Sequence, residues 1–153
     1  MSMFTIIPKK PSRPVESWLQ VKDQALKTVE FMRKHTHPNG RRHLALHHAQ
    51  ISKDPLNFFV VPQDPDNLLL PMMVIMNLKI TGKENPVNHT EACMSFPFRP
   101  AKNVRRYSTI IASFDEYSER DGLVHRSDEK VEGLLAYIFQ HEAQHARGEH
   151  IYL

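Results

Sequence analysis

Apolar residues recur along this chain with two different periods, and the change of period predicts helices near the two ends with strands between them. Residues 18–34 carry apolar side chains at helical spacing, and Ser17 before them suits an N-cap, so we expect an amphipathic helix there. Proline and Asn-Gly in residues 35–40 end that helix. The apolar run at residues 131–139 predicts a second, buried helix that continues towards the end of the chain.

The middle of the chain is typical of strands, because short apolar or alternating runs are bounded by proline, glycine and polar residues. The expected strands are residues 41–50, 56–61, 72–80, 107–114 and a short one around residues 123–124. The expected connections are Thr81-Gly82, a polar loop at residues 84–90, a basic loop before residue 107 and a turn at residues 117–122. Strands flanked by a helix at each end predict an α+β fold, and the length predicts a single domain over residues 1–153.

The composition excludes several classes of function. Hydrophobic residues make up 41% of the 153 residues and charged residues 24%, as in a soluble globular protein. No apolar run is long enough to span a membrane, and the first residues lack the features of a secretory signal. The net charge of +3 is less than a dedicated nucleic-acid binder usually carries. We therefore expect a protein that is not secreted and has no membrane or specific nucleic-acid partner.

A His-Glu-x-x-His motif stands in the predicted second helix. His141 and His145 are four residues apart, so on a helix both imidazoles lie on one face and can reach one metal ion. Glu142 lies beside them, where a carboxylate can act on a water held by that metal. A hydrogen-bonded cluster in the core is the alternative, because a buried helix carries such polar side chains only when they are satisfied. Metal ligation is the favoured interpretation.

Two further sets of residues leave alternatives open. Cys93 is the single cysteine, which excludes an internal disulfide and suits a reducing compartment. It can be a small buried residue, a nucleophile or a metal ligand. His43 and His47 would form a rival metal site if residues 41–50 were helical, but leucines at alternate positions and a turn just upstream favour a strand there.

Three motifs stand in an order that resembles the peptide deformylase family. They are His-Leu-Ala-Leu-His-His-Ala-Gln at residues 43–50, Glu-Ala-Cys-Met-Ser at residues 91–95 and Gln-His-Glu-Ala-Gln-His at residues 140–145. The resemblance extends from residue 5 to residue 153. It implies antiparallel or mixed sheets packed around a central C-terminal helix that carries the His-Glu-x-x-His motif, with one N-terminal helix.

The resemblance also implies one divalent metal ion as cofactor. Carried over to this chain, its protein ligands would be Cys93, His141 and His145, with water at the fourth position. Ferrous iron is often the native ion in the family, and zinc, nickel or cobalt can substitute. Three protein ligands with one open position are the usual catalytic arrangement, whereas a structural site is usually closed by four.

The implied reaction removes the N-formyl group from peptides that begin with formylmethionine and releases formate. Glu142 would take a proton from the metal-bound water and then pass a proton to the leaving nitrogen. The side chain of Gln50 and the backbone N–H of Met94 would stabilise the oxyanion. The residues expected to contact the substrate are Ala45, Leu46, Glu91, Ala92, Leu134 and Ile138.

The expected partner is the formylated peptide, and the ribosome is a further, weak one. Because the sequence ends at Leu153, directly after the predicted second helix, we expect a short form without the C-terminal helix with which many bacterial deformylases dock near the ribosomal exit tunnel. Short forms without that helix resemble those encoded by some phages. The expected location is the cytoplasm, for a bacterial or phage-encoded protein, or an organelle.

The chain departs from the family pattern around the expected cleft. Glycines and small residues of the first motif are replaced by His43, Ala45, His47 and His48. Ala92 likewise replaces a glycine, and such side chains could narrow or repolarise the cleft. Gln144 replaces an aspartate that pairs with an arginine, here Arg106, so a charge pair near the metal is lost. The alternative functions are a metallohydrolase of another N-formyl or N-acyl compound, and an inactive metal-binding or peptide-binding relative.

Overall fold

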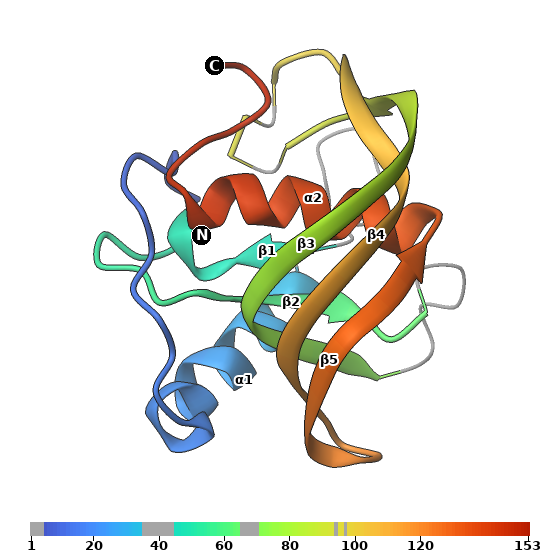
Figure 1. Cartoon of the computed structure of the whole chain (residues 1–153). Coiled ribbons are helices and arrows are strands. Elements are labelled where there is room, and N and C mark those ends of the chain that lie inside the picture. The colour runs from blue at the N-terminus through green and yellow to red at the C-terminus, as the bar shows by residue number, and fades with distance from the viewer. Residues whose placement is uncertain (1–4, 35–44, 65–70, 94, 97) are drawn as a thin grey trace.

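The computed structural model describes residues 5–34, 45–64, 71–93, 95–96 and 98–153 of the chain (Figure 1). Its elements are α1 (Trp18–Lys34), β1 (Leu46–His47), the 3-10 turn η1 (His48–Gln50), β2 (Phe58–Pro62), β3 (Met72–Glu91), β4 (Lys102–Ser118), β5 (Gly122–Glu132) and α2 (Leu134–Ala146). The strands form one sheet in the order β1-β2-β3-β4-β5, and all neighbouring strands are antiparallel. The predicted α+β fold is therefore confirmed.

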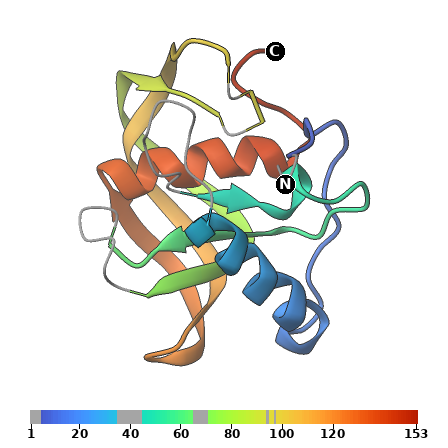
Figure 2. The same cartoon turned by 180° about the vertical axis from the view of Figure 1, so that it is seen from behind.

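Both faces of the sheet are buried at β2, because a helix packs on each side. Phe58 and Val60 belong to the core cluster that contains α1, whereas Phe59 and Val61 belong to the cluster that contains α2. This alternation follows from the period of two along a strand. In both views α2 runs alongside β1, and the long strands β3, β4 and β5 curve across it (Figures 1 and 2).

Two residues fix α2 against the sheet. Gly133, between β5 and α2, has a φ of +68°, a conformation that residues with a side chain rarely adopt, so the chain passes from strand to helix without a loop. The Gln140 side chain donates to the Tyr107 carbonyl at 2.8 Å and accepts from the Tyr107 N–H at 2.9 Å. The following residue, His141, thereby has a fixed position relative to β4.

Both predicted helices are present. α1 covers the predicted residues 18–34. α2 begins at Leu134, later than the start of the apolar run, because Val131 and Glu132 still pair with β4. Among the described residues, neither helix combines the length and the apolar character needed to cross a lipid bilayer.

The predicted strands are present, but three of them are longer than predicted. β3 does not end at Thr81-Gly82, and residues 84–90, predicted as a polar loop, belong to it. β4 begins at Lys102 inside the predicted basic loop, and the short last strand is the 11-residue β5. The loop predictions are wrong because the exposed part of β3 is held by its backbone ladder with β4 and not by apolar burial.

The first motif is a strand only in part. Leu46 and His47 form β1, so the extended prediction is confirmed for this pair and the helical alternative is wrong there. The next three residues form η1, which carries Gln50. His43 lies outside the described residues.

Gly148 follows α2 and lies against the N-terminal segment. Its φ is +77°, and a Cβ placed on it would lie 2.6 Å from backbone atoms of Lys10. We expect Gly148→Ala to lower the free energy of unfolding by roughly 2 kcal/mol or more, because a left-handed backbone costs about 1–2 kcal/mol and overpacking adds to it. Gly122→Ala is the matched control, with a φ of +68° and open space around its Cβ. If urea denaturation gave the same loss of unfolding free energy for both variants, the contact with Lys10 would have no role in the effect.

Candidate metal centre

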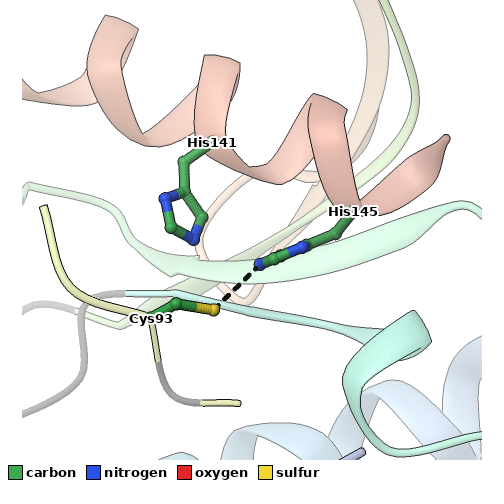
Figure 3. A group of neighbouring side chains, drawn as sticks. All are labelled: Cys93, His141 and His145. Carbon is green, nitrogen blue, oxygen red and sulfur yellow. Dashed lines mark hydrogen bonds between the residues drawn. The ribbon is translucent and has the colours of Figure 1, made fainter. Parts of the chain in front are cut away.

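Three side chains of the kinds that can bind a metal ion converge beside the second half of α2. His141 and His145 project from α2 towards Cys93, which follows the end of β3 (Figure 3). One donor atom from each of the three lies within 4.8 Å of the other two, and the Cys93 Sγ is 3.5 Å from the His145 Nε2. Cys93 and His145 are fully buried. One sulfur and two imidazole nitrogens can therefore hold one metal ion.

Hydrogen bonds on the far side of each imidazole orient the ring. His141 Nδ1 donates to Glu91 Oε1 at 2.7 Å, and His145 Nδ1 donates to the Glu149 carbonyl at 2.9 Å. A carbonyl only accepts, and burial lowers the pKa of His145 well below its usual range, so this ring is neutral with a free Nε2 lone pair. Such outer hydrogen bonds are typical of metal-binding histidines.

When this site holds no metal ion, the His141 imidazole is held in its protonated, positively charged form. Burial alone would lower the pKa of His141, but hydrogen bonds with Cys93 and Glu91 outweigh it and raise the pKa to about 10. Because Nδ1 faces Glu91, the second proton lies on the side of Cys93. Metal binding releases such protons from its ligands, so a divalent cation would replace this one. The residues thus fit a metal ion.

A buried charge network supports His141 from behind. Arg106 of β4 donates two hydrogen bonds to Glu91, at 2.7 and 2.8 Å, and one to Gln144 Oε1 at 2.8 Å. Burial would raise the pKa of Glu91, but the hydrogen bonds from Arg106 and His141 outweigh it and lower the pKa to about 2. Gln144 cannot pair with Arg106 as a charge, but it still accepts a hydrogen bond from it. The negative charge that pairs with Arg106 comes from Glu91.

Glu142 is buried next to the donor set, with 3% of its surface exposed. Burial raises its pKa to about 7. Among the buried side-chain nitrogen and oxygen atoms of the described residues, its Oε2 lacks a hydrogen-bond partner. An unpaired polar atom in the interior costs about 1–3 kcal/mol, so this oxygen is suited to a group that binds in the site.

Gln50 lies beside Cys93. Its Oε1 accepts from the His47 N–H at 3.0 Å, and its Nε2 donates to Ser95 Oγ at 3.1 Å and approaches Cys93 Sγ at 3.8 Å. Gln50 is fully buried, so its amide is held in one orientation beside the thiol. Met94, the other predicted oxyanion donor, lies outside the described residues.

The predicted substrate-contacting residues differ in their surroundings. Three of them belong to the core cluster of α2 or pack against it: Ala45, Leu134 and Ile138. Ala92 is exposed beside Cys93. Leu46 is fully buried in the α1 cluster and exposes no surface to a substrate, unlike the other predicted contacts. Glu91 is buried and its carboxylate contacts His141.

The two described histidines of the first motif hold the backbone around η1. His47 Nδ1 accepts from the Ala49 N–H at 3.0 Å, and His48 Nδ1 accepts from the Leu56 N–H at 2.9 Å. Burial lowers the pKa of His47 to about 3 and that of His48 to about 4, so both rings are neutral. Their nitrogens thereby fix the turn that carries Gln50.

The sequence interpretation missed His89 and Tyr137. His89 Nδ1 lies 3.0 Å from Glu91 Oε2, and its ring stacks on Tyr137 with centroids 4.2 Å apart. Their spacing was the available signal, because His89 is two residues before Glu91 on a strand and Tyr137 is one helical turn before His141. The stacked pair therefore lies beside the residues that support the donor set.

The fold and this site are typical of a metal-dependent hydrolase, with three buried protein donors and a carboxylate beside them on a His-Glu-x-x-His helix. A family model described as polypeptide deformylase matches residues 6–152. The chain therefore belongs to the polypeptide deformylase family, and the resemblance seen in its motifs is confirmed.

Curated relatives match over part of their length. The peptide deformylases of Zymomonas mobilis and Endomicrobium trichonymphae are 41% and 37% identical to this chain over 78 and 90 residues. The matched segments are 50% and 59% of this chain, and 40% and 49% of the two relatives. The match thus spans half or less of the length of each of these curated relatives.

Solved structures match along almost the whole chain. The peptide deformylase from Thermus thermophilus is 25% identical with a TM-score of 0.74, and the match covers 99% of this chain and 84% of that one. A probable peptide deformylase from a Synechococcus phage shares the fold at 22% identity and a TM-score of 0.73, covering 99% of this chain and 97% of that one.

Proposed function

We propose that this chain is a peptide deformylase, a metal-dependent hydrolase that removes the N-formyl group from N-terminal formylmethionine of nascent peptides. The observation that carries the proposal is Glu142, whose buried and unpartnered Oε2 accompanies a Cys-His-His donor set. A relative that only binds metal or peptide has no use for a base at this position, so Glu142 weighs against the inactive alternative.

Cys93, His141 and His145 would hold one divalent ion. When bound, the ion supplies Lewis acidity, which polarises a carbonyl group and lowers the pKa of water. We propose ferrous iron as the native ion, with zinc, nickel or cobalt as substitutes, since thiolate and imidazole donors suit all four. Glu91 and the Glu149 carbonyl would keep the two imidazoles oriented towards it.

The chain's own groups would handle the proton and the developing charge. Glu142 takes a proton from the attacking water at Oε2 and returns one to the leaving amine nitrogen, so that formate and a free amino terminus are released. Gln50 Nε2 carries two hydrogens, one donated to Ser95 and one to the Cys93 Sγ, and we propose that the second turns to the oxyanion that forms beside the thiol. The backbone N–H of Met94 is the proposed second donor.

The substrate would extend along Ala45 on one side and Ala92 on the other, since both expose some surface and Leu46 does not. Leu134 and Ile138 would contact the side chain of its first residue. The exposed Ala92 stands where the family pattern has a glycine, so it adds a side chain to this cleft. That observation favours a second candidate function, hydrolysis of another N-formyl or N-acyl compound, including formyl peptides whose first residue is not methionine.

The proposed partners are formylated nascent peptides and, weakly, the ribosome. Such peptides are made in the bacterial cytoplasm and in organelles, so we propose one of these as the location. A phage-encoded protein would act in the cytoplasm of its host.

Formate release from formyl-Met-Ala-Ser by anaerobically prepared, iron- or nickel-loaded protein tests the proposal. We expect turnover from this peptide and none from acetyl-Met-Ala-Ser. The chelator-treated protein and Cys93→Ala are the controls, and both should be inactive because the donor set is empty or incomplete. Absence of formate at full metal occupancy would refute the proposal, and faster release from formyl peptides with another first residue would support the second candidate.

Restoring the acid of the family pattern at position 144 should tighten metal retention. Gln144→Asp changes the acceptor of the Arg106 hydrogen bond from a neutral amide to a carboxylate, and pairs of Arg with a carboxylate are among the strong hydrogen bonds. A firmer Arg106 would hold Glu91, and through it His141, more rigidly. We expect the metal dissociation constant, measured by chelator competition, to fall several-fold. An unchanged constant, or one no different from that of Gln144→Ala, would contradict this.

A further inference from the structure

The segment after α2 returns across the loop that follows Cys93, although the two are far apart in sequence. Both views place the end of the chain next to the segment between β3 and β4 (Figures 1 and 2). Ile151 is buried there, with 4% of its surface exposed. The C-terminal residues are therefore packed against the chain that presents the thiol.

The contact is built around one guanidinium group. Arg99 lies over the Tyr152 ring at 4.8 Å and over the Phe96 ring at 5.3 Å, and the two rings are themselves in edge contact at 4.9 Å. A guanidinium over an aromatic face is an attractive arrangement. Two polar contacts lock it: the Tyr152 hydroxyl donates to the Pro100 carbonyl at 2.6 Å, and Lys102 Nζ donates to the Ile151 carbonyl at 2.9 Å.

This cluster is connected to two of the three donors. The Phe96 N–H donates to the Cys93 carbonyl at 2.9 Å, so the ring in contact with Tyr152 belongs to the same turn as the thiol. At the other end, the Glu149 carbonyl accepts from His145 Nδ1 at 2.9 Å. The segment after α2 therefore contacts both the turn that carries Cys93 and the imidazole of His145.

We propose that Phe96, Arg99 and Tyr152 form a C-terminal clasp that holds the Cys93 Sγ beside the His145 Nε2. Arg99 and Tyr152 are positioning residues, since they act on the site through Phe96 and the turn after Cys93. The consequence for metal binding rests on the proposed function, whereas the burial and position of the thiol do not. Opening the clasp frees this turn, exposes Cys93 and separates it from His145.

Because Cys93 is the single cysteine, its modification by a disulfide reagent reports directly on the clasp. In metal-free protein we expect Tyr152→Ala and Arg99→Ala to speed modification about tenfold or more. Arg99→Lys keeps a cation over the rings and should restore most of the protection, and Tyr152→Phe, which loses only the Pro100 bond, should lie between. Leu153→Ala is the matched control, because this neighbouring side chain is 78% exposed.

A distant variant separates the clasp from a general loss of stability. Val131→Ala shortens a core side chain on β5, and the urea concentration can be set so that its unfolded fraction equals that of Tyr152→Ala. Faster modification of Tyr152→Ala than of Val131→Ala under these conditions supports the clasp. Equal rates, or a Tyr152→Ala rate equal to that of the unaltered chain, would overturn it.

Cobalt-loaded protein tests the consequence for the metal. Thiolate ligation gives cobalt an absorption band, and we expect Arg99→Ala and Tyr152→Ala to release cobalt to a chelator about tenfold faster, with loss of this band. Unchanged release would overturn the positioning role. A cobalt-loaded unaltered chain without a thiolate band would instead refute the metal ligation by Cys93 in the proposed function, while the thiol-modification result would still decide on the clasp.

Discussion

Replacement of Glu142 by glutamine is expected to lower kcat for formate release by roughly 10²–10⁴-fold, the usual contribution of a positioned general base. The amide has the shape of the carboxyl group but cannot take a proton from water. The Cys93, His141 and His145 donors are unaltered, so the metal content should stay that of the unaltered protein. Formate release and metal content, measured on the same nickel-loaded sample, test both expectations.

The neighbouring acid Glu149 offers a matched control for this change. Its carboxylate pairs with Arg147, its side chain is 41% exposed, and only its carbonyl contacts the donor set. Glu149→Gln should therefore leave kcat within about twofold, because a substitution on the surface seldom reaches the site. Full turnover by Glu142→Gln would refute the base, and equal losses in the two variants would point to a general electrostatic effect.

The helices and the spacing of the histidine pair could be predicted because their signals are local. The apolar stripe of α1 lies within residues 18–34, and the helical period alone puts His141 and His145 on one face. β2 could also be predicted, because both of its faces are buried and its residues form a continuous apolar run. In each case the information is contained within a few turns or residues.

The length of β3 could not be predicted, because it depends on a partner far along the chain. Beyond Gly82 its residues are largely polar, and they stay extended because they pair with β4, for example Glu91 with Lys102. A polar strand and a polar loop have the same hydrophobic pattern. Only the register with β4 distinguishes them.

The place of Cys93 is the clearest limit of local reasoning. From the sequence, a lone cysteine can be a buried core residue, a nucleophile or a metal ligand. In the structure the Cys93 thiol contacts His145, which is 52 positions away. The family resemblance, and not the pattern around Cys93, suggested that partner. The outer contacts of the site, such as the Glu149 carbonyl on His145 and Arg99 over Tyr152, depend on the path of the chain after α2 and have no local signal.

Replacement of Arg106 by methionine is expected to lower the free energy of unfolding by roughly 3–5 kcal/mol, the usual cost of removing one partner of a buried ion pair. The Arg106 and Glu91 side chains are each 7% exposed, so the carboxylate that the variant leaves behind is shielded from water and keeps only its contacts with His141 and His89. Methionine retains much of the apolar stem, so lost packing contributes little. Urea denaturation of chelator-treated protein measures the loss without the stabilisation that bound metal would add.

Arg126→Met on the neighbouring strand is the matched control. Arg126 contacts Glu116 at the same 2.7 Å, but its side chain is 38% exposed, so the expected loss is below about 1 kcal/mol. Adding Glu91→Gln to Arg106→Met removes the buried carboxylate charge, so the double variant should recover part of the lost free energy of unfolding. Its metal affinity should be below that of the unaltered protein, because His141 has lost its ionised acceptor. Equal losses for the two arginines, or no recovery in the double variant, would mean that the buried pair does not stabilise the fold in this way.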